Sequence, residues 1–543
     1  MISDIDSFAH RATLDADVVV VGAGAAGITL ALALNGSSLK VVVLESGTFE
    51  FTEAIQALYR GAIVGRGTED PAVSRLRFFG GSTNHWAGWC RPLEPGDFSG
   101  RPDWPDSAWP FGREALDAYY REAAALCELG PDRFDDLEYW RARSGRPLTP
   151  FALDPERLRT AVFQVSPPTR FGEAYRDELA RSTNVEVILA ASALRIEAAA
   201  GTEPGQARKT VAGVSAGSLS GRRLAVRGRV VVLAVGGLET ARLLLLSRDV
   251  FPAGAGNEHD LVGRFFLDHP WMRGAAYLRF SGRDNAWPLY FDEHEIAGAR
   301  LFGAVSSTPA ALRREAIGAF RFAFLPSTVS TLGTDSLDAI LGGLGEGRVV
   351  DDFAEHLGNV AADLDWVADA AWRKLLGAKS SPFVERSSDD IRGAVVDLNF
   401  EQRPNRDSRV RLDAARDAFG DPRVALDWRL SETDRRTADR ALELLALEMG
   451  RLGLGRLQRI GGMERLDEAW PPTLMGSRHH SGGARMSRDP TTGVTDGEGR
   501  VHSCANLYVA GSALFSTIGY ANPTLTIVAL ALRQAQHLKQ VLS

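Results

Sequence analysis

The residues best suited to proton transfer lie near the C-terminus, in residues 478–486, which contain the adjacent pair His479 and His480. An imidazole titrates close to neutral pH, so a histidine serves either as a general base or as a metal ligand. Neighbouring residues on a strand or loop point in different directions, and no cluster of carboxylates or cysteines accompanies this pair. The sequence therefore favours proton transfer over metal binding, and we expect no metal ion.

A second polar residue of interest, Asn522, lies between the apolar run 506–512 and an apolar helical pattern. The run predicts a strand that ends near Gly511. Asparagine is a common N-cap and proline fits the first helical position, so we expect Asn522 to cap a helix that begins with Pro523 and Thr524. A helix N-terminus that points at a ligand stabilises negative charge on that ligand.

A glycine-rich turn near the N-terminus predicts a dinucleotide-binding element. The apolar run 17–21 is typical of a buried parallel strand, and a helical segment follows Gly22, Gly24 and Gly27. In this context the first glycine makes the turn, the second lets the backbone approach a pyrophosphate, and the third lets the helix pack closely on the strand. The helix N-terminus adds unpaired N–H groups and a partial positive charge.

An acidic residue, Glu45, follows the next apolar run, 41–44, at the spacing expected for a ribose-binding acid. Its carboxylate would accept a hydrogen bond from a ribose 2′-hydroxyl and would repel the 2′-phosphate of NADP. The turn and this acid together predict FAD or NAD as the ligand. The glycines also interrupt the apolar stretch 17–34, which argues against a membrane span there.

Residues 77–89 form a stretch that is dense in glycine and aromatic residues, with small polar residues between them. Such a loop can lie flat against a planar ring system and supply backbone N–H groups and stacking. The alternative is a surface loop with trapped aromatic side chains. The residues that we expect to contact a cofactor here are Gly80, Gly81, Asn84, His85 and Trp86.

The composition is that of an ordinary globular protein. Its 543 residues suit two or more domains, and 45% hydrophobic and 24% charged residues are typical values. A formal net charge of −7 gives no basic footprint for nucleic acid or for a membrane surface. Three scattered cysteines and an N-terminus without a signal-peptide pattern lead us to expect a cytoplasmic protein.

The remaining patterns predict more of the nucleotide-binding sheet and a second, mostly antiparallel sheet. Apolar runs at 185–189 and 230–234 resemble the first strands, and alternating apolar residues begin near residue 270. The glycine- and serine-rich stretch 327–347 predicts either a mobile lid or an inert connector. Further predicted elements are the helices 113–129, 239–247 and 431–452 and the strands 395–399, 408–412 and 424–428.

These blocks, in this order, resemble the glucose-methanol-choline (GMC) flavin oxidoreductases over nearly the whole chain. The loop 80–86 is most similar to the pyranose-oxidase and glycoside-oxidase branch of that family. Besides this loop and the glycine turn with Glu45, the resemblance rests on residues 236–240, 263–264, 268–270, 403–405, 407–408 and 427–428, the His479 segment and the Asn522-Pro523 helix.

The resemblance implies FAD as the cofactor and an α/β fold. We expect a doubly wound FAD-binding domain built from residues 12–95, 160–270 and 465–543. Residues 96–159 and 271–464 are expected to form an α+β substrate-binding domain and cap with an antiparallel sheet. Glu45 is then assigned to the adenosine ribose of FAD, and Gly511 is assigned to the cofactor site as well.

The resemblance also implies the catalytic residues. The family pattern is a histidine, two variable residues, a glycine, three further residues and a methionine, which His479 fits and His480 does not. Asn522 falls where the second catalytic residue of the family, a histidine or an asparagine, stands. His479 would remove the hydroxyl proton while hydride leaves for flavin N5, and Asn522 would hold the substrate oxygen. We expect His269 to be a structural hydrogen-bonding residue.

One position bears on how the flavin is held. In the glycoside-oxidase branch, the histidine of a Thr-His-Trp sequence is bonded covalently to the flavin 8α-methyl group, and His85 stands at that position. This chain has Asn84 in place of the threonine. A covalent bond and a noncovalent contact of His85 with the flavin both stay open.

The implied activity is oxidation of a hydroxyl group of a sugar, glycoside or amino-sugar-bearing metabolite to a carbonyl, with oxygen or another electron acceptor. The alternatives are a lyase of the same fold that uses FAD structurally, oxidation of a non-sugar alcohol, and a flavin-binding protein without turnover. The expected partners are a small-molecule alcohol and an electron acceptor, with no nucleic acid and no membrane.

Overall fold

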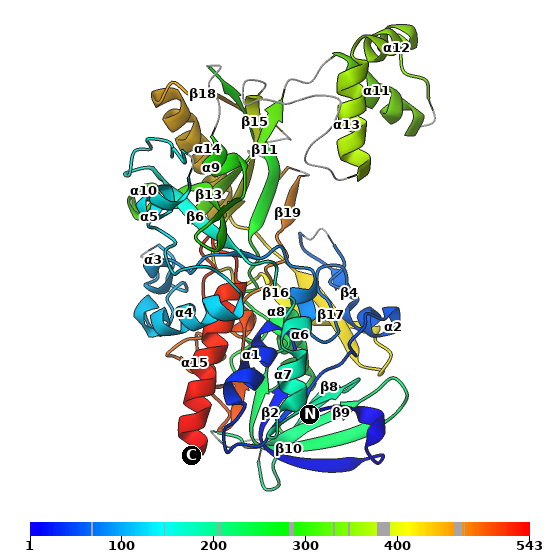
Figure 1. The fold of residues 1–543 in the computed structure, drawn as a ribbon. Coiled ribbons are helices and arrows are strands. Elements are labelled where there is room, and N and C mark those ends of the chain that lie inside the picture. The colour runs from blue at the N-terminus through cyan, green and yellow to red at the C-terminus, as the bar shows by residue number, and fades with distance from the viewer. Residues whose placement is uncertain are drawn as a thin grey trace.

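Two large β-sheets, one above the other in Figure 1, organise the computed structural model of the chain. The structure describes all residues except 67–68, 102, 146, 204–205, 207, 282–286, 329–331, 346–347, 377–390, 461–469 and 472. A smaller three-stranded sheet lies between the large ones at one side.

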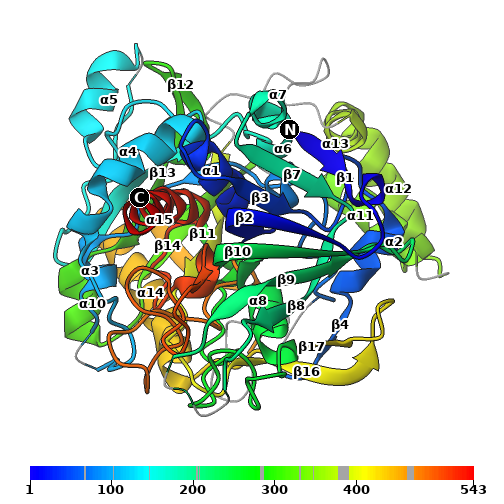
Figure 2. The same ribbon diagram turned by 90° about the horizontal axis from the view of Figure 1, so that it is seen from below.

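The first sheet contains the strands predicted around the glycine turn. β2 (Ala12–Val21) lies between β3 (Val41–Leu44) and β10 (Arg223–Leu233), and it pairs with both in parallel. Val18, Val19 and Val20 are fully buried, as a strand covered on both faces requires. The other strands of this sheet are β1 (Ile2–Asp4), β7 (Val185–Leu189), β8 (Ser192–Ala198), β9 (Val211–Gly217) and β20 (Leu507–Val509). Figure 2 shows the strand order β1-β7-β3-β2-β10-β9-β8 across the sheet.

Three helices pack around the first sheet and begin near the functional region. α1 (Ala25–Leu34) packs against β2 and β3, and it lies beside α15 (Thr524–Leu542) in Figures 1 and 2. α8 (Gly236–Leu246) follows β10 and packs against β8. The second glycine pair, Gly236-Gly237, opens this helix rather than forming a separate turn before it.

The second sheet is antiparallel throughout its described pairings. Its central strands are β11 (Pro270–Phe280), β15 (Ile391–Phe400), β14 (Phe320–Thr328) and β13 (Ala299–Ser307), in that spatial order. The sheet also contains β5 (Trp89–Cys90), β6 (Leu158–Val165), β12 (His294–Ile296), β18 (Gly455–Arg459) and β19 (Leu474–Gly476). Our predicted domain boundary at residue 160 falls inside β6, whose residues pair with β13 of the second sheet.

The third sheet joins distant parts of the chain. β17 (Pro422–Asp427) pairs with β16 (Arg409–Arg416) in antiparallel fashion and with β4 (Gly61–Ile63) in parallel. The strands expected at 408–412 and 424–428 therefore form, but they do not extend the second sheet.

Besides α1, α8 and α15, the body of the protein contains one long helix and several short ones. α14 (Glu432–Arg451), the helix predicted over 431–452, begins with a capping box between Ser431 and Asp434 and packs on the second sheet. The short helices are α2 (Glu53–Gln56), α3 (Pro95–Phe98), α4 (Asp117–Leu126), α5 (Leu137–Arg143), α6 (Phe171–Ala174), α7 (Arg176–Arg181), α9 (Pro288–Phe291) and α10 (Pro309–Glu315).

The stretch 327–347, predicted as a lid or a connector, contains a helix. α11 (Leu332–Gly345) packs with α12 (Phe353–Ala362) and α13 (Leu364–Leu376), and the three helices project from the body at the upper right of Figure 1. The glycines of this stretch obscured its helical spacing of apolar residues. Parts of the stretch, residues 329–331 and 346–347, lie outside the described residues.

Each large sheet has its own hydrophobic core. One buried cluster surrounds the first sheet with α1, α8 and α15, and a second lies between the second sheet and α14. Among the described residues, no helix combines the length and the apolar character needed to cross a bilayer.

Candidate active site

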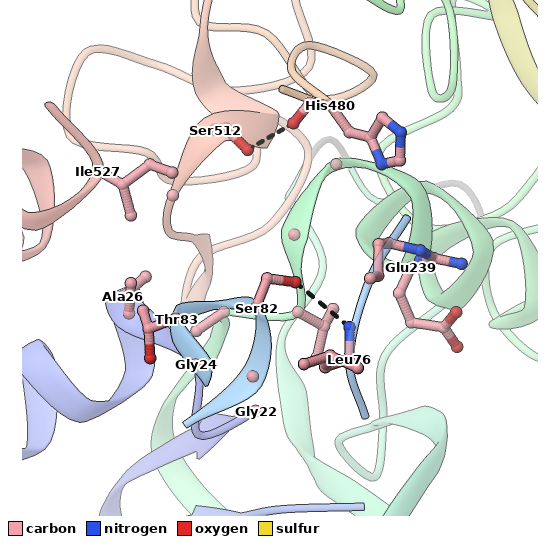
Figure 3. Close-up of a pocket in the computed structure, with 18 of the residues that line it drawn as sticks. Gly22, Gly24, Ala26, Leu76, Ser82, Thr83, Glu239, His480, Ser512 and Ile527 are labelled. Carbon is pink, nitrogen blue, oxygen red and sulfur yellow. Dashed lines mark hydrogen bonds between the residues drawn. The ribbon is translucent and has the colours of Figure 1, made fainter. Parts of the chain in front are cut away.

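A cavity of about 390 Å³ lies where segments from both ends of the chain meet. In Figure 3, Gly22 and Gly24 lie on one side of it and Ser512 and Ile527 on another. The predicted residues that line the cavity are Gly22, Gly24, Glu45, Gly81, His85, Trp86, His479, Gly511, Asn522, Pro523 and Thr524.

The glycine turn has the geometry of a cradle for an extended ligand. Gly22 has φ +99°, which side chains rarely tolerate, and a Cβ at Gly27 would lie 1.8 Å from the carbonyl oxygen of Gly22. A Cβ at Gly24, in contrast, would meet nothing within 4 Å, because this backbone faces the cavity. The first N–H groups of α1, which lack helical partners, therefore have open space in front of them.

Glu45 lines the cavity and also braces the glycine turn. Its carboxylate accepts hydrogen bonds from the backbone N–H groups of Ala23 and Gly47, each at 2.8 Å. Burial raises the pKa of Glu45, although these N–H groups oppose the shift. Each oxygen keeps a second lone pair for a ligand hydroxyl.

The aromatic loop divides into residues that face the cavity and residues that support the loop. Gly81, His85 and Trp86 line the cavity, and the Trp86 indole donates to the carbonyl oxygen of Thr169 at 2.9 Å. Gly80 and Asn84, which we expected at the cofactor, do not line it. The Asn84 amide instead donates to the carbonyl oxygen of Phe79 at 2.9 Å and holds the loop closed.

A buried ion-pair network beside the cavity was not predicted. The Glu239 carboxylate lies 2.9 Å from Arg242 and 3.4 Å from Arg77. Burial alone would raise the pKa of Glu239, but these two arginines lower it to about 2. Arg77 and Glu239 belong to segments that the sequence analysis selected for their glycines. Their ion pair could not be predicted, because the two residues are far apart in the sequence.

A chain of hydrogen bonds fixes the protonation of His479. His269 Nε2 lies 2.9 Å from the carbonyl oxygen of Gly519, which can only accept, so this nitrogen carries a proton. His269 Nδ1 is then the acceptor for His479 Nδ1, 2.9 Å away. His479 Nε2 is therefore left without a proton, and the ring is held in that tautomer.

Burial keeps both histidines neutral. It is the largest cause that lowers the pKa of His269 to about 3 and the pKa of His479 well below that of an ordinary imidazole. The neighbouring His269 and Arg321 also disfavour a positive charge on His479 and so lower its pKa further. The backbone N–H of His479 donates to Asp268 at 2.8 Å, which anchors this segment.

Asn522 does not cap α15, contrary to our prediction. The helix begins at Thr524, with Pro523 and not Asn522 in the N-cap position. Its Nδ2 instead lies 3.3 Å from His479 Nε2, and its buried Oδ1 has no partner among the described residues. The contact with His479 outweighs the local capping preference, so the amide faces the cavity.

The described residues contain no group of three or more histidine, cysteine or acidic side chains placed to hold a metal ion. His480 lies beside His479 but 3.9 Å from Asp268, and its carbonyl oxygen accepts from Ser512 at 2.7 Å (Figure 3). An unprotonated imidazole nitrogen and an amide thus converge on a cavity that has a dinucleotide cradle at its other end.

Comparison with known proteins agrees with this arrangement. Residues 17–63 match the model of an FAD binding domain, and residues 404–531 match the family model described as GMC oxidoreductase. These two matches, one toward each end of the chain, show its similarity to GMC oxidoreductases. The match to an FAD binding domain supports FAD as the cofactor, and the α/β sheets have the fold of the solved structures that the chain resembles.

Two relatives in Streptomyces extend the comparison. Paromamine 6′-oxidase of Streptomyces fradiae is 32% identical over 191 residues, which are 34% of this chain and 34% of that protein. The match therefore covers about a third of the length of this relative. The 6′′′-hydroxyparomomycin C oxidase of Streptomyces lividus is 25% identical over 569 residues, with 96% of this chain and 90% of that protein covered.

A solved structure shares the fold along the full length. Formate oxidase of Aspergillus oryzae RIB40 has a TM-score of 0.55 and 16% identity, and the match covers 98% of this chain and 99% of that chain.

Proposed function

We propose that this protein is a GMC oxidoreductase that oxidises a hydroxyl group of a sugar, a glycoside or an amino-sugar-bearing metabolite to a carbonyl, with His479 as the base. The observation that carries the proposal is the unprotonated Nε2 of His479, held toward the cavity by His269 and faced by Asn522. Relatives named as paromamine and hydroxyparomomycin oxidases support an amino-sugar or glycoside substrate.

The cavity residues fit FAD. We propose that the N-terminus of α1 and Gly24 hold its pyrophosphate and Glu45 its adenosine ribose, while Gly81, His85 and Trp86 contact the ring system. When bound, FAD supplies the acceptor for the hydride that leaves the carbinol carbon. The N-terminus of α15, with Pro523 and Thr524 at the cavity, would stabilise negative charge at the ring edge.

The chain's own groups handle the proton and the substrate oxygen. His479 Nε2 accepts the hydroxyl proton, which makes the C–H bond of the same carbon a better hydride donor. Asn522 Nδ2, 3.3 Å from that nitrogen, donates to the substrate oxygen and does not titrate. General-base catalysis of this kind contributes roughly 10²–10⁴-fold to the rate.

We propose a division of labour between the two large sheets. The first sheet and its helices would be the doubly wound FAD-binding unit of residues 12–95, 160–270 and 465–543. The second sheet would cover the reacting end of the cavity as the substrate-binding unit of residues 96–159 and 271–464, with β6 joined to it by pairing.

We propose that His85 contacts FAD without a covalent bond, since Asn84 replaces the threonine of the covalent pattern. Acid precipitation of the yellow holoprotein should then leave the flavin in the supernatant. A yellow pellet would show a covalent bond instead.

The proposed function is tested by flavin reduction under anaerobic conditions. Methyl glucoside, methyl glucosaminide, paromamine and an aliphatic diol are each mixed with the holoprotein. We expect one of the sugar compounds to bleach the oxidised flavin band, and His479→Ala to abolish the bleaching while FAD stays bound. His294→Gln, which alters a buried histidine in β12, is the matched control.

Each alternative predicts a different result. A lyase would convert a compound without any bleaching, and an oxidase of non-sugar alcohols would bleach with the diol alone. Bleaching at an unchanged rate in His479→Ala would remove the base assignment.

A further inference from the structure

The guanidinium of Arg321, in β14, is buried and has no counter-ion among the described residues. Its residue is 5% exposed, and its Nε has no partner. No hydrogen bond or ion pair connects the guanidinium group of Arg321 to any residue that the structure describes. Its contacts are with two aromatic rings, Trp89 at 5.2 Å and Phe163 at 5.0 Å from the guanidinium carbon.

Other buried arginines among the described residues have polar partners: Arg75 donates to the carbonyl oxygens of Pro71 and Tyr59, and several others lie beside a carboxylate. Arg91 lies 2.6 Å from Glu94 and 2.6 Å from Asp135, and Arg242 contacts Glu239 and Asp417. A buried charge without a partner costs several kcal/mol, whereas paired ones recover much of this cost.

The carboxylate that acts on Arg321 most strongly is already engaged. Asp397 raises the pKa of Arg321, but burial wins and lowers that pKa to about 10. Asp397 accepts hydrogen bonds from the backbone N–H of Gly274 at 2.8 Å and from the Trp271 indole at 3.3 Å. It therefore does not neutralise Arg321 through a direct contact.

Arg321 lies next to the reacting end of the cavity. Trp89, on which it stacks, lines the cavity. Asn399 is its partner in the β14–β15 register, and the Asn399 amide donates to Ser477, another lining residue, at 2.7 Å. The Oδ1 of Asn399 is itself buried and has no hydrogen-bond partner in the part of the chain that the structure describes.

The positive charge of Arg321 acts on the proposed base, His479. It contributes to lowering the pKa values of both His479 and His269. A ligand group between Arg321 and His479 would therefore be favoured if negative and disfavoured if positive. A carboxylate accepts the forked N–H groups of arginine in a bidentate manner, which an ammonium group cannot do.

We propose that Arg321 binds a carboxylate of the substrate, so that the preferred substrate of the proposed oxidation is a sugar acid or a glycoside bearing a carboxylate. The inference rests on the proposed function for the oxidation step, but the anion site itself does not. It separates this chain from relatives whose named substrates, such as paromamine, carry amino groups.

Binding is measured first, with probes that cannot be oxidised. Tetrahydropyran-2-carboxylate, its neutral carboxamide and the cationic tetrahydropyranyl-methylamine are titrated into the oxidised holoprotein, and the flavin absorption band reports binding. We expect the carboxylate to bind at least tenfold more tightly than the carboxamide, since hydrogen bonds to charged groups contribute about 1.5–3 kcal/mol. Equal affinities for the carboxylate and the carboxamide would overturn the inference.

Variants then assign the preference to this residue. Arg321→Gln should lose the preference for the carboxylate, and Arg321→Lys should keep part of it because the positive charge remains. Arg279→Gln, on the exposed side of β11, is the matched control and should leave it unchanged. A preference that persists in Arg321→Gln would refute the assignment, and the wild-type titration stands even if that variant does not fold.

Turnover separates the two proposals. Methyl glucuronoside, methyl glucoside and methyl glucosaminide are compared by anaerobic flavin reduction, with the glucuronoside expected to have the highest kcat/KM. Bleaching by the glucoside with no preference for the glucuronoside would overturn the inference and keep the proposed function. Selective carboxylate binding without bleaching by any of the three would support the anion site and count against the proposed oxidation.

Discussion

The hydrogen-bond chain through His269 predicts how the reactivity of His479 is set. In His269→Leu, the Nδ1–H of His479 would be buried without an acceptor. An unsatisfied buried donor costs about 1–3 kcal/mol. The other tautomer of His479 avoids this cost by carrying its proton on Nε2, where it can no longer accept the substrate proton.

This cost converts into a rate. At about 1.4 kcal/mol per tenfold, the reactive tautomer becomes roughly 5- to 150-fold less populated. We therefore expect anaerobic flavin reduction by the best sugar substrate to slow by about that factor at saturating substrate. KM should change little, because the Asn522 amide still faces the substrate oxygen.

A conservative variant separates positioning from mere structural support. In His269→Gln, the amide Nε2 can donate to the carbonyl oxygen of Gly519 and the Oε1 can accept from His479 Nδ1. The reduction rate should return to within about threefold of wild type. Stopped-flow absorbance measures all variants, with His294→Leu as a control for loss of a buried histidine. A leucine variant as fast as wild type, or a glutamine variant as slow as leucine, would refute the tautomer argument.

Three further predictions concern the cofactor half and the pH dependence. Gly27→Ala should release FAD on gel filtration, because its Cβ would lie 1.8 Å from the Gly22 oxygen. Glu239→Gln leaves Arg242 buried with one carboxylate fewer and should destabilise the holoprotein by about 3–5 kcal/mol in denaturant unfolding. The acid-side loss of kcat/KM should lie below pH 6.5, because His479 must be neutral to accept a proton and its pKa is lowered.

Each of these has its own check. Gly342→Ala in α11, where a Cβ meets nothing within 4 Å, should retain FAD. Glu293→Gln breaks a half-exposed pair with Arg300 and should change the free energy of unfolding by less than about 1 kcal/mol. Arg321→Gln removes a positive charge that lowers the pKa of His479, so the acid-side loss should move to higher pH. An acid-side loss centred above pH 7 in the wild type would contradict the buried, neutral base.

Much of the FAD-binding half could be predicted because its signals are local. The strand at 185–189 forms with the predicted bounds, since a short apolar β-branched run has few other ways to be buried. The glycine turn has the expected backbone geometry at Gly22 for a similar reason, since only glycine readily adopts that φ. The helix predicted from residue 431 likewise begins as expected, because its start is fixed by a capping box between residues three apart.

Predictions that needed distant partners were incomplete. The sequence singled out His269 as a hydrogen-bonding residue, but its partner His479 is 210 residues away. Asn522 has the local features of an N-cap, and only the approach of His479 turns its amide into the cavity. Asn84 looked like a cofactor contact, yet the closed loop turns its amide onto Phe79.

The sequence by itself therefore determined the nucleotide-binding strands, the glycine turn, the resemblance to the GMC family and the identity of the two polar residues that face each other in the cavity. The tertiary structure decided which tautomer His479 adopts, and it buried Arg321 without a counter-ion among the residues that it describes. The physical reason is range. Backbone preference and hydrophobic periodicity act over a few residues, whereas protonation and charge balance depend on groups that only the folded chain brings within 3–5 Å.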